Sequence, residues 1–91
     1  MSRPIKKRCI AFHPEANLFS PLPKWTATGI VDLYPDEIEA LRLVDYEGLT
    51  QKEAAERMGI SRGTVWRLLH SGRKKVVAMI VEHRVLRVLK R

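Results

Sequence analysis

Apolar and polar positions follow two different patterns along the chain, and the change between them falls near residue 34. Residues 1–34 hold four of the five prolines and one short apolar alternation, at residues 8–12. Pro14 ends that alternation, so it predicts at most a short strand within an irregular segment. From residue 35 onward, apolar side chains recur at helical spacing. The pattern predicts one mainly α domain, with three to four helices in residues 35–91 and an irregular N-terminal segment in residues 1–34.

The first predicted helix begins at Pro35, because proline suits the first helical position and Asp36 and Glu37 place negative charge at the positive end of the helix dipole. Gly48 is expected to end it. Apolar side chains cover a wide arc of this helix, which predicts packing on two sides: Ile38, Ala40, Leu41, Leu43 and Val44. The acidic side chains of this part of the chain are expected on solvated faces and at caps: Asp36, Glu37, Glu39, Asp45, Glu47, Glu53 and Glu56.

A second, short helix is predicted over Gln51–Met58. Thr50 and Glu53 have the spacing of a capping box, in which each side chain accepts a hydrogen bond from the backbone of the other residue. Gly59 follows the last helical residue and is the natural place for the chain to turn.

A third helix is predicted to begin at Arg62, with Ser61 as its cap. Residues 76–81 continue it with an uncharged apolar run. Two readings stay open for residues 84–91: they either extend the helix or form a strand that pairs with residues 8–12.

The spacing within residues 51–70 is typical of a helix-turn-helix. Two helices that cross steeply need small residues at the crossing and a turn residue that tolerates positive φ. They also need apolar side chains that return to a shared core. The sequence has a suitable residue at each of these positions: Ala54, Ala55, Gly59, Ile60, Val65 and Leu68. Each match is weak by itself, but together they predict this motif.

A helical wheel of residues 61–76 separates a core face from a cationic face. The predicted core face holds Val65, Leu68, Leu69, Gly72 and Val76. The opposite face holds Arg62, Gly63, Trp66, Arg67, His70, Arg73 and Lys74. A recognition helix in the major groove of DNA has this arrangement, and its N-terminal residues reach the base edges. A charged helical face is more often merely solvated, so the prediction depends on its combination with the turn and the small-residue crossing.

Charge is segregated along the chain in a way that supports a polyanionic partner. The formal net charge is +7, but residues 61–91 carry nine Lys/Arg and one acid, whereas residues 34–60 carry three Lys/Arg and seven acids. The C-terminal third is therefore a concentrated cationic element, and double-stranded DNA is its expected partner.

Three stretches give the chain a resemblance to a known family: RCIAFHPEANLFSP, DEIEALRLVDYEGLTQKEAAERMGISRGTVWRLL and GRKKVVAMIVE. The chain resembles a family of small predicted DNA-binding proteins of bacteria and archaea, whose helix-turn-helix is similar to the fourth region of sigma factors. The resemblance implies a three- or four-helix DNA-binding domain with a regulatory role, and Arg62 and Arg67 match its base-contacting positions. The chain departs from the family at Glu82-His83, where a glycine is usual, and at Trp66, where a smaller or polar residue is usual.

The chemistry of the side chains suggests individual roles. Arg62 suits a bidentate contact to guanine, with a phosphate contact as the alternative, and Gly63 leaves room for close approach. Arg67 could reach a base or a phosphate. Phosphate contacts are expected from the remaining polar members of the motif: Ser61, Thr64, Gln51, Lys52, Arg73 and Lys74, with Lys75 as a further neutraliser.

Two aromatic side chains and the basic N-terminal tail leave alternatives open. Trp66 and His70 lie on the predicted DNA face, but Trp66 also borders the core, so a half-buried packing role competes with a DNA contact. The tail is either an arm on DNA or simply solvated, and its cations are Arg3, Lys6, Lys7 and Arg8.

Apolar surface near the end of the third helix predicts a homodimer. The side chains concerned exceed what a domain of this size easily covers: Val76, Val77, Met79, Ile80, Val81, Leu86 and Leu89. A two-fold dimer would read paired half-sites.

Other function classes have less support in the sequence. Cys9 is the single cysteine, so an internal disulfide is excluded, and a buried free thiol is favoured over a metal site shared with His13. We expect a cytoplasmic protein without cofactor, metal, small-molecule substrate or membrane segment, and not an enzyme. The rival hypothesis is an interaction module that docks on a transcription complex through Trp66. RNA binding is disfavoured because Trp25, Tyr34 and Phe19 are scattered.

Overall fold

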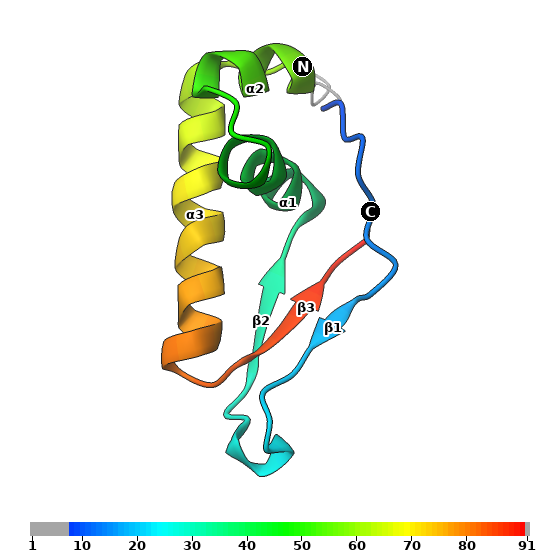
Figure 1. The fold of residues 1–91 in the computed structure, drawn as a ribbon, viewed down its shortest axis with the longest axis vertical. Helices are drawn as coiled ribbons and strands as arrows, with labels where there is room; N and C mark the ends of the chain where they lie inside the picture. Colours follow the sequence, from blue (N-terminus) through cyan, green and yellow to red (C-terminus); the bar gives the residue numbers. More distant parts are fainter. Residues whose placement is uncertain (1–7, 91) are drawn as a thin grey trace, which may run out of the picture.

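Three helices and a three-stranded sheet make up the part of the chain that the structure, a computed structural model, describes, which is residues 8–90 (Figure 1). The helices are α1 (Pro35–Leu41), α2 (Gln51–Met58) and α3 (Arg62–Val81), and α1 continues into a π-helical turn, η2 (Arg42–Tyr46). The strands are β1 (Leu18–Phe19), β2 (Ile30–Leu33) and β3 (Val85–Val88), and a 3₁₀ turn, η1 (Lys24–Thr26), lies between β1 and β2. α1 and α2 lie at one end of the molecule against the N-terminal half of α3, and the sheet lies beside the C-terminal half of α3 (Figure 1).

The predicted helix boundaries are confirmed by local hydrogen bonds. At α2, the Glu53 amide donates to Thr50 Oγ1 (3.1 Å), and the Thr50 amide donates to Glu53 Oε1 (2.9 Å), which completes the capping box. Gly59 follows α2 in the left-handed conformation with φ of 65°. The Thr64 amide donates to Ser61 Oγ (3.1 Å), so Ser61 caps α3 as expected.

The helix that begins at Pro35 ends in a π-helical turn before it reaches Gly48. The Glu47 amide donates to the Arg42 carbonyl (2.8 Å), a spacing of five residues that defines a π turn. Gly48, with φ of 80°, then reverses the chain as expected. The widened turn still buries Leu43, which is 1% exposed.

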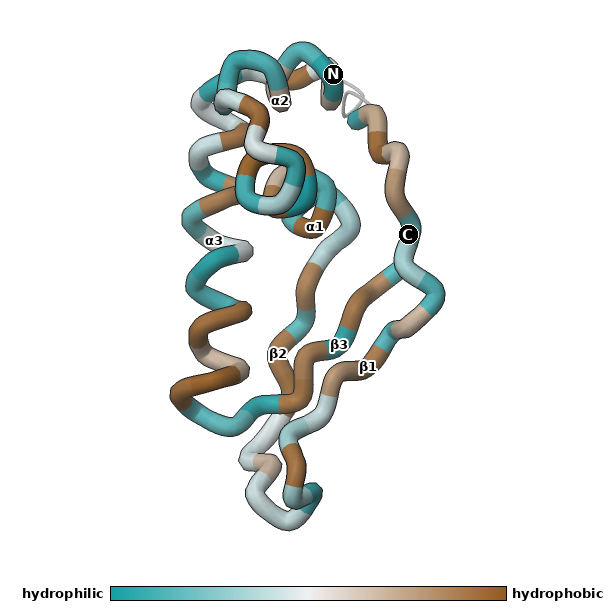
Figure 2. Tube along the Cα trace, in the orientation of Figure 1, coloured by the Kyte–Doolittle hydropathy of each residue, from teal (hydrophilic) through white to brown (hydrophobic). Residues whose placement is uncertain are grey.

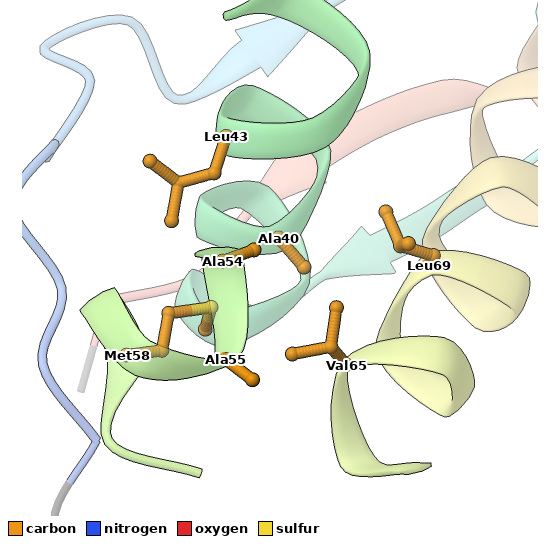
Figure 3. Packing of buried hydrophobic residues seen from close by; sticks show 7 residues of the cluster. All are labelled: Ala40, Leu43, Ala54, Ala55, Met58, Val65 and Leu69. Atoms are coloured by element: carbon orange, nitrogen blue, oxygen red, sulfur yellow. The ribbon is translucent and has the colours of Figure 1, made fainter. Parts of the chain in front are cut away.

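The core lies where α1, α2 and α3 meet (Figure 3). Its members are almost fully buried: Ala40, Leu43, Ala54, Ala55, Met58, Val65 and Leu69. The alanines of α1 and α2 let the backbones approach closely, while Val65 and Leu69 fill the space from α3 (Figure 3). Gly72 serves the crossing of α1 and α3, because a Cβ there would lie 3.0 Å from Leu41 Cδ1. The core face predicted for α3 is thereby confirmed at Val65, Leu69 and Gly72.

The sheet corrects the interpretation of both ends of the chain. The strand order is β1-β3-β2, with β3 antiparallel to β1 and parallel to β2. The strand alternative for residues 84–91 is confirmed by β3, but its predicted partner, residues 8–12, is wrong. Residues 1–34 are also not uniformly irregular, since β1 and β2 lie within them. These strands have two and four residues, which is too short for a clear alternating pattern.

Residues 8–12 run beside the helices instead of joining the sheet. The Cys9 amide donates to the Met58 carbonyl (3.0 Å), and the Ala11 amide donates to Glu39 Oε2 (3.0 Å). These bonds tie the segment to α2 and α1. Cys9 itself is exposed, so its expected burial is wrong.

Three acids of α1 are buried, against the expectation of a solvated face. Asp36, Glu37 and Glu39 are 7%, 3% and 2% exposed. Each is compensated by a cation: Arg8 pairs with Asp36, Lys75 Nζ lies 2.8 Å from Glu37 Oε1, and Arg42 lies 2.9 Å from Glu39 Oε2. A buried carboxylate is tolerated where charge-assisted hydrogen bonds replace its water. Arg8 and Lys75 are distant in sequence from Asp36 and Glu37, so the pattern within α1 could not reveal these two ion pairs.

Burial by itself would raise the pKa of Glu39, but its bonding partners reverse the direction. Hydrogen bonds from Arg42 and from the amides of Ala11 and Phe12 outweigh the desolvation and hold the pKa of Glu39 below its ordinary value. Glu39 is therefore a charged anchor that joins α1 to residues 8–12.

The connection from α3 to β3 needs a left-handed residue. His83 has φ of 57°, the one positive φ at a non-glycine residue in residues 8–90. Left-handed backbone costs a residue with a Cβ about 1–2 kcal/mol. The strain lies at the Glu82-His83 position, where the resemblance implies a glycine.

Candidate nucleic-acid interface

The outward face of α3 carries the polar side chains that the helical wheel predicted. The exposed residues are Arg62, Gly63, Trp66, Arg67, His70, Arg73 and Lys74, whereas Val65, Leu69 and Gly72 are buried against α1 and α2. We call the exposed set the α3 cationic face. α3 contains no acidic residue. Figure 2 shows the hydropathy changing along α3, from mixed near α2 to hydrophobic near the sheet.

Hydroxyl groups organise the first turn of α3. Ser61 Oγ and Thr64 Oγ1 lie 2.9 Å apart, and Arg67 Nη2 donates to Thr64 Oγ1 (3.3 Å). The Ser61 hydroxyl is thus chiefly a cap, and Arg67 is held over the first turn. This chain of bonds places a guanidinium next to the positive end of the helix dipole.

Arg62 and Gly63 are exposed at the N-terminal end of the face. Arg62 is exposed and makes no ion pair with any described residue. A Cβ on Gly63 would find only Ser61 Oγ, at 3.9 Å, so the space beside the helix is open there. A flat or charged group can therefore approach the backbone closely.

Trp66 belongs to the exposed face and not to the border of the core. Its side chain is 54% exposed, and it is not part of the core cluster. The ring stacks on His70, with centroids 5.2 Å apart and planes 8° from parallel. Of the two roles left open for Trp66, packing on the core has no support among the described core contacts, and the indole packs on an aromatic partner one helical turn away.

The three consecutive cations near the middle of α3 have different environments. Arg73 donates to both carboxylate oxygens of Asp45, at 3.0 and 2.8 Å, so part of its charge is already neutralised. The hydrogen bond from Arg73 lowers the pKa of Asp45 below its ordinary value. Lys74 is exposed without an ion pair to any described residue. Lys75 turns inward to Glu37 and over the ring of Tyr34 (4.6 Å), so its expected role as a free phosphate neutraliser is wrong.

The start of α2 adds two polar side chains. Lys52 is exposed and Gln51 is half-buried. α2 lies across the N-terminal end of α3 (Figure 1), so α2 and the first turns of the α3 cationic face belong to the same end of the molecule. Arg8 is committed to Asp36, and Arg3, Lys6 and Lys7 of the proposed arm lie outside the described residues.

Residues 8–15 and α1 border a groove of about 1370 Å³ that is open to solvent. Its charged lining is largely paired internally, since Arg8 binds Asp36 and Arg42 binds Glu39. Within residues 8–90, no three His, Cys, Asp or Glu side chains gather to hold a metal ion. The helices of these residues include none with the length and apolar character to cross a membrane.

Comparison with protein families matches residues 1–90 to the family described as "Protein of unknown function DUF134". The chain belongs to the DUF134 family. It is 56% identical to a UPF0251 protein of Pyrococcus furiosus over 92% of this chain and 80% of that protein. It is 54% identical to a UPF0251 protein of Thermococcus kodakarensis over 90% of this chain and 74% of that protein.

A more distant DUF134 relative, a UPF0251 protein of Desulforudis audaxviator, is 47% identical over 97% of this chain and 58% of its own length. No solved structure matches the chain. The expected relation to a family of archaea and bacteria is confirmed, whereas its sigma-like helix-turn-helix and DNA binding stay predictions, since these proteins are named without a function.

Proposed function

We propose that α2, the turn at Gly59 and α3 form a helix-turn-helix that binds double-stranded DNA and regulates transcription, without enzymatic activity. The observation that carries the proposal is the α3 cationic face. From Arg62 to Lys74 it presents basic and aromatic side chains without an acid of its own, while the opposite side of α3 is anchored in the core.

The dimensions and polarity of this face suit the major groove. Residues 62–74 span about 18 Å of helix, at about 1.5 Å per residue. The major groove is about 12 Å wide and admits one α-helix. The positive end of the α3 dipole has a neutral cap, Ser61, so it adds to the attraction for phosphate. Arg62 projects from the first turn, where a recognition helix contacts base edges.

A salt titration of duplex binding tests the proposal. If about six phosphates are contacted, the logarithm of the binding constant should fall against the logarithm of salt concentration with a slope near −5. Fluorescence anisotropy with a labelled duplex measures this slope. A slope near zero would overturn DNA binding.

A matched pair of variants locates the interface. Arg62→Ala removes a charge from the α3 cationic face, and Lys24→Ala removes one from η1 at the far end of the molecule, where Lys24 is exposed. Arg62→Ala should weaken specific binding by about 1–3 kcal/mol, whereas Lys24→Ala should leave it nearly unchanged. Equal losses in both variants would point to unspecific attraction by net charge.

The C-terminal end of α3 supports a homodimer as part of the proposal. Val77, Ile80 and Val81 are 53%, 67% and 69% exposed and carry no charge. Leu86 was expected to add to this surface, but it is buried at 6% exposure. A clean monomer by sedimentation equilibrium at micromolar concentration would overturn the dimer, and Ile80→Asp should shift a dimer toward monomer.

The same exposed Trp66 favours a second candidate, a docking module on a transcription complex. Large aromatic side chains are frequent binding hot spots in protein interfaces. Tight partner binding that is insensitive to salt, combined with no binding to duplex DNA, would favour this alternative.

A further inference from the structure

Trp66 is an apolar side chain held in the middle of a cationic face. Its ring is 54% exposed and stacks on His70 with the planes 8° apart. The two residues are four positions apart on one helix, so the stack depends only on α3 itself. The stack therefore holds one face of the indole ring against His70. We call this pair the aromatic platform.

Arg62 and Gly63 lie one helical turn before Trp66, and both are exposed. Helical side chains lean toward the N-terminus, so we expect the indole to extend toward the turn that holds Arg62 and Gly63. Gly63 contributes no side chain, and a Cβ there would meet nothing closer than Ser61 Oγ at 3.9 Å. The first two turns of α3 thus bring an exposed aromatic ring, an open glycine backbone and an exposed arginine to one stretch of the helix.

A ligand for this stretch of the helix needs an apolar group next to a hydrogen-bond acceptor. The C5 methyl group of thymine is the one methyl group on the major-groove edges of the four bases, and guanine offers two acceptors, N7 and O6, to an arginine. We propose that the aromatic platform binds the C5 methyl group of a thymine, beside a guanine bound by Arg62. This inference rests on the proposed DNA binding and adds the chemical group that the protein reads.

The charge of the face favours this reading over a role for Trp66 in phosphate binding. Lys74 and Arg67 supply phosphate-binding cations on the same face, and the indole has a single donor. Its large apolar area gains from contact with a methyl group and not from contact with a phosphate.

Replacing thymine by deoxyuridine tests the inference, because the change removes only the methyl group. A preferred duplex is first selected from a random library with the wild-type protein. Each thymine of that duplex is then replaced singly by deoxyuridine, and affinities are compared by anisotropy. At one position next to a guanine, loss of the methyl should weaken binding about fourfold, the effect of burying one such group.

Variants assign the methyl preference to its residue. Trp66→Ala should bind the thymine and deoxyuridine duplexes equally, and Trp66→Phe should keep a preference for thymine because an aromatic ring remains. Trp25→Ala is the matched control, since Trp25 is 84% exposed in η1 at the opposite end of the molecule. It should keep the full fourfold preference. Circular dichroism melting checks that each variant is folded.

The possible results distinguish failure of the methyl contact from failure of the proposed DNA binding. Sequence-specific, salt-dependent binding in which every deoxyuridine duplex binds like its thymine parent would overturn the methyl contact alone. A methyl preference that survives in Trp66→Ala would overturn the assignment to the aromatic platform. Absence of salt-dependent duplex binding by the wild type would overturn the proposed function, and the methyl contact with it.

Discussion

Glu37 joins α1 and α3 through a buried carboxylate. Replacing Glu37 measures how much this carboxylate contributes to the free energy of unfolding. The side chain is 3% exposed. It accepts a hydrogen bond from the Tyr34 amide (2.9 Å), one from Lys75 Nζ (2.8 Å) and one from Ser71 Oγ. It therefore links the N-terminus of α1 to the middle of α3.

The size of the expected loss of unfolding free energy follows from these three hydrogen bonds. Hydrogen bonds to a charged group contribute about 1.5–3 kcal/mol each, but bonds within one network are not additive. Removal of one partner of a buried pair costs about 3–5 kcal/mol, because the other charge is left uncompensated. Glu37→Ala should therefore lower the free energy of unfolding by about 3–5 kcal/mol. That is a large share of the roughly 5–15 kcal/mol of a small domain.

Urea denaturation followed by circular dichroism measures this change. The control is Glu47→Gln, because Glu47 is exposed and makes one long contact with Arg42 (3.3 Å), which should contribute less than about 1 kcal/mol. The double variant Glu37→Leu/Lys75→Met should recover part of the loss, since it leaves no buried charge unpaired. A loss below about 1 kcal/mol in Glu37→Ala would refute the reasoning.

Three further predictions concern charge and backbone strain. Asp45→Asn should release Arg73 for phosphate, which would raise duplex affinity and make the salt slope steeper by about one unit in anisotropy titrations. His83→Gly should raise the free energy of unfolding in urea by about 0.5–1 kcal/mol, because relief of the left-handed strain exceeds the added flexibility of the unfolded chain. Glu39 has a lowered folded pKa, so its stabilising contribution is present above its ordinary pKa of 4.5 and is lost as the pH falls through the folded value. Glu39→Gln should accordingly flatten the acid side of the profile of unfolding free energy against pH.

Matched controls keep these outcomes interpretable. Glu56→Gln removes an exposed acid that has no ion pair with the described residues, so it should change the salt slope much less than Asp45→Asn does. His13→Gly replaces an exposed histidine without positive φ and should not stabilise the protein. An unchanged salt slope in Asp45→Asn, or an unaltered acid profile in Glu39→Gln, would count against the role given to that ion pair.

The helix boundaries were predictable because their causes are local. The capping box of Thr50 and Glu53, the left-handed Gly59 and the Ser61 cap each depend on residues within four positions of one another. The core face of α3 followed from its periodicity for the same reason. Such signals are visible in one sequence because the helix geometry fixes which residues are neighbours.

The remaining features depend on contacts between distant segments. β2 pairs with β3 across 55 positions, and Glu37 meets Lys75 across 38. No spacing rule within a short window reports such pairs. The position of the Trp66 ring could be predicted only in part. The helical wheel gave its direction around α3, but whether the ring rests on the core or on His70 depends on its rotamer.

The central position of β3 has a consequence for the order of folding during synthesis. β1 and β2 both pair with β3 and not with each other. Both strands precede β3 by more than 50 residues. The three-stranded sheet can therefore close only after residues 85–88 have left the ribosome. By then the contacts among α1, α2 and α3, which are closer in sequence, can already have formed. β1 and β2 therefore stay unpaired until residues 85–88 are made, which gives the nascent chain a period of exposed strand edges.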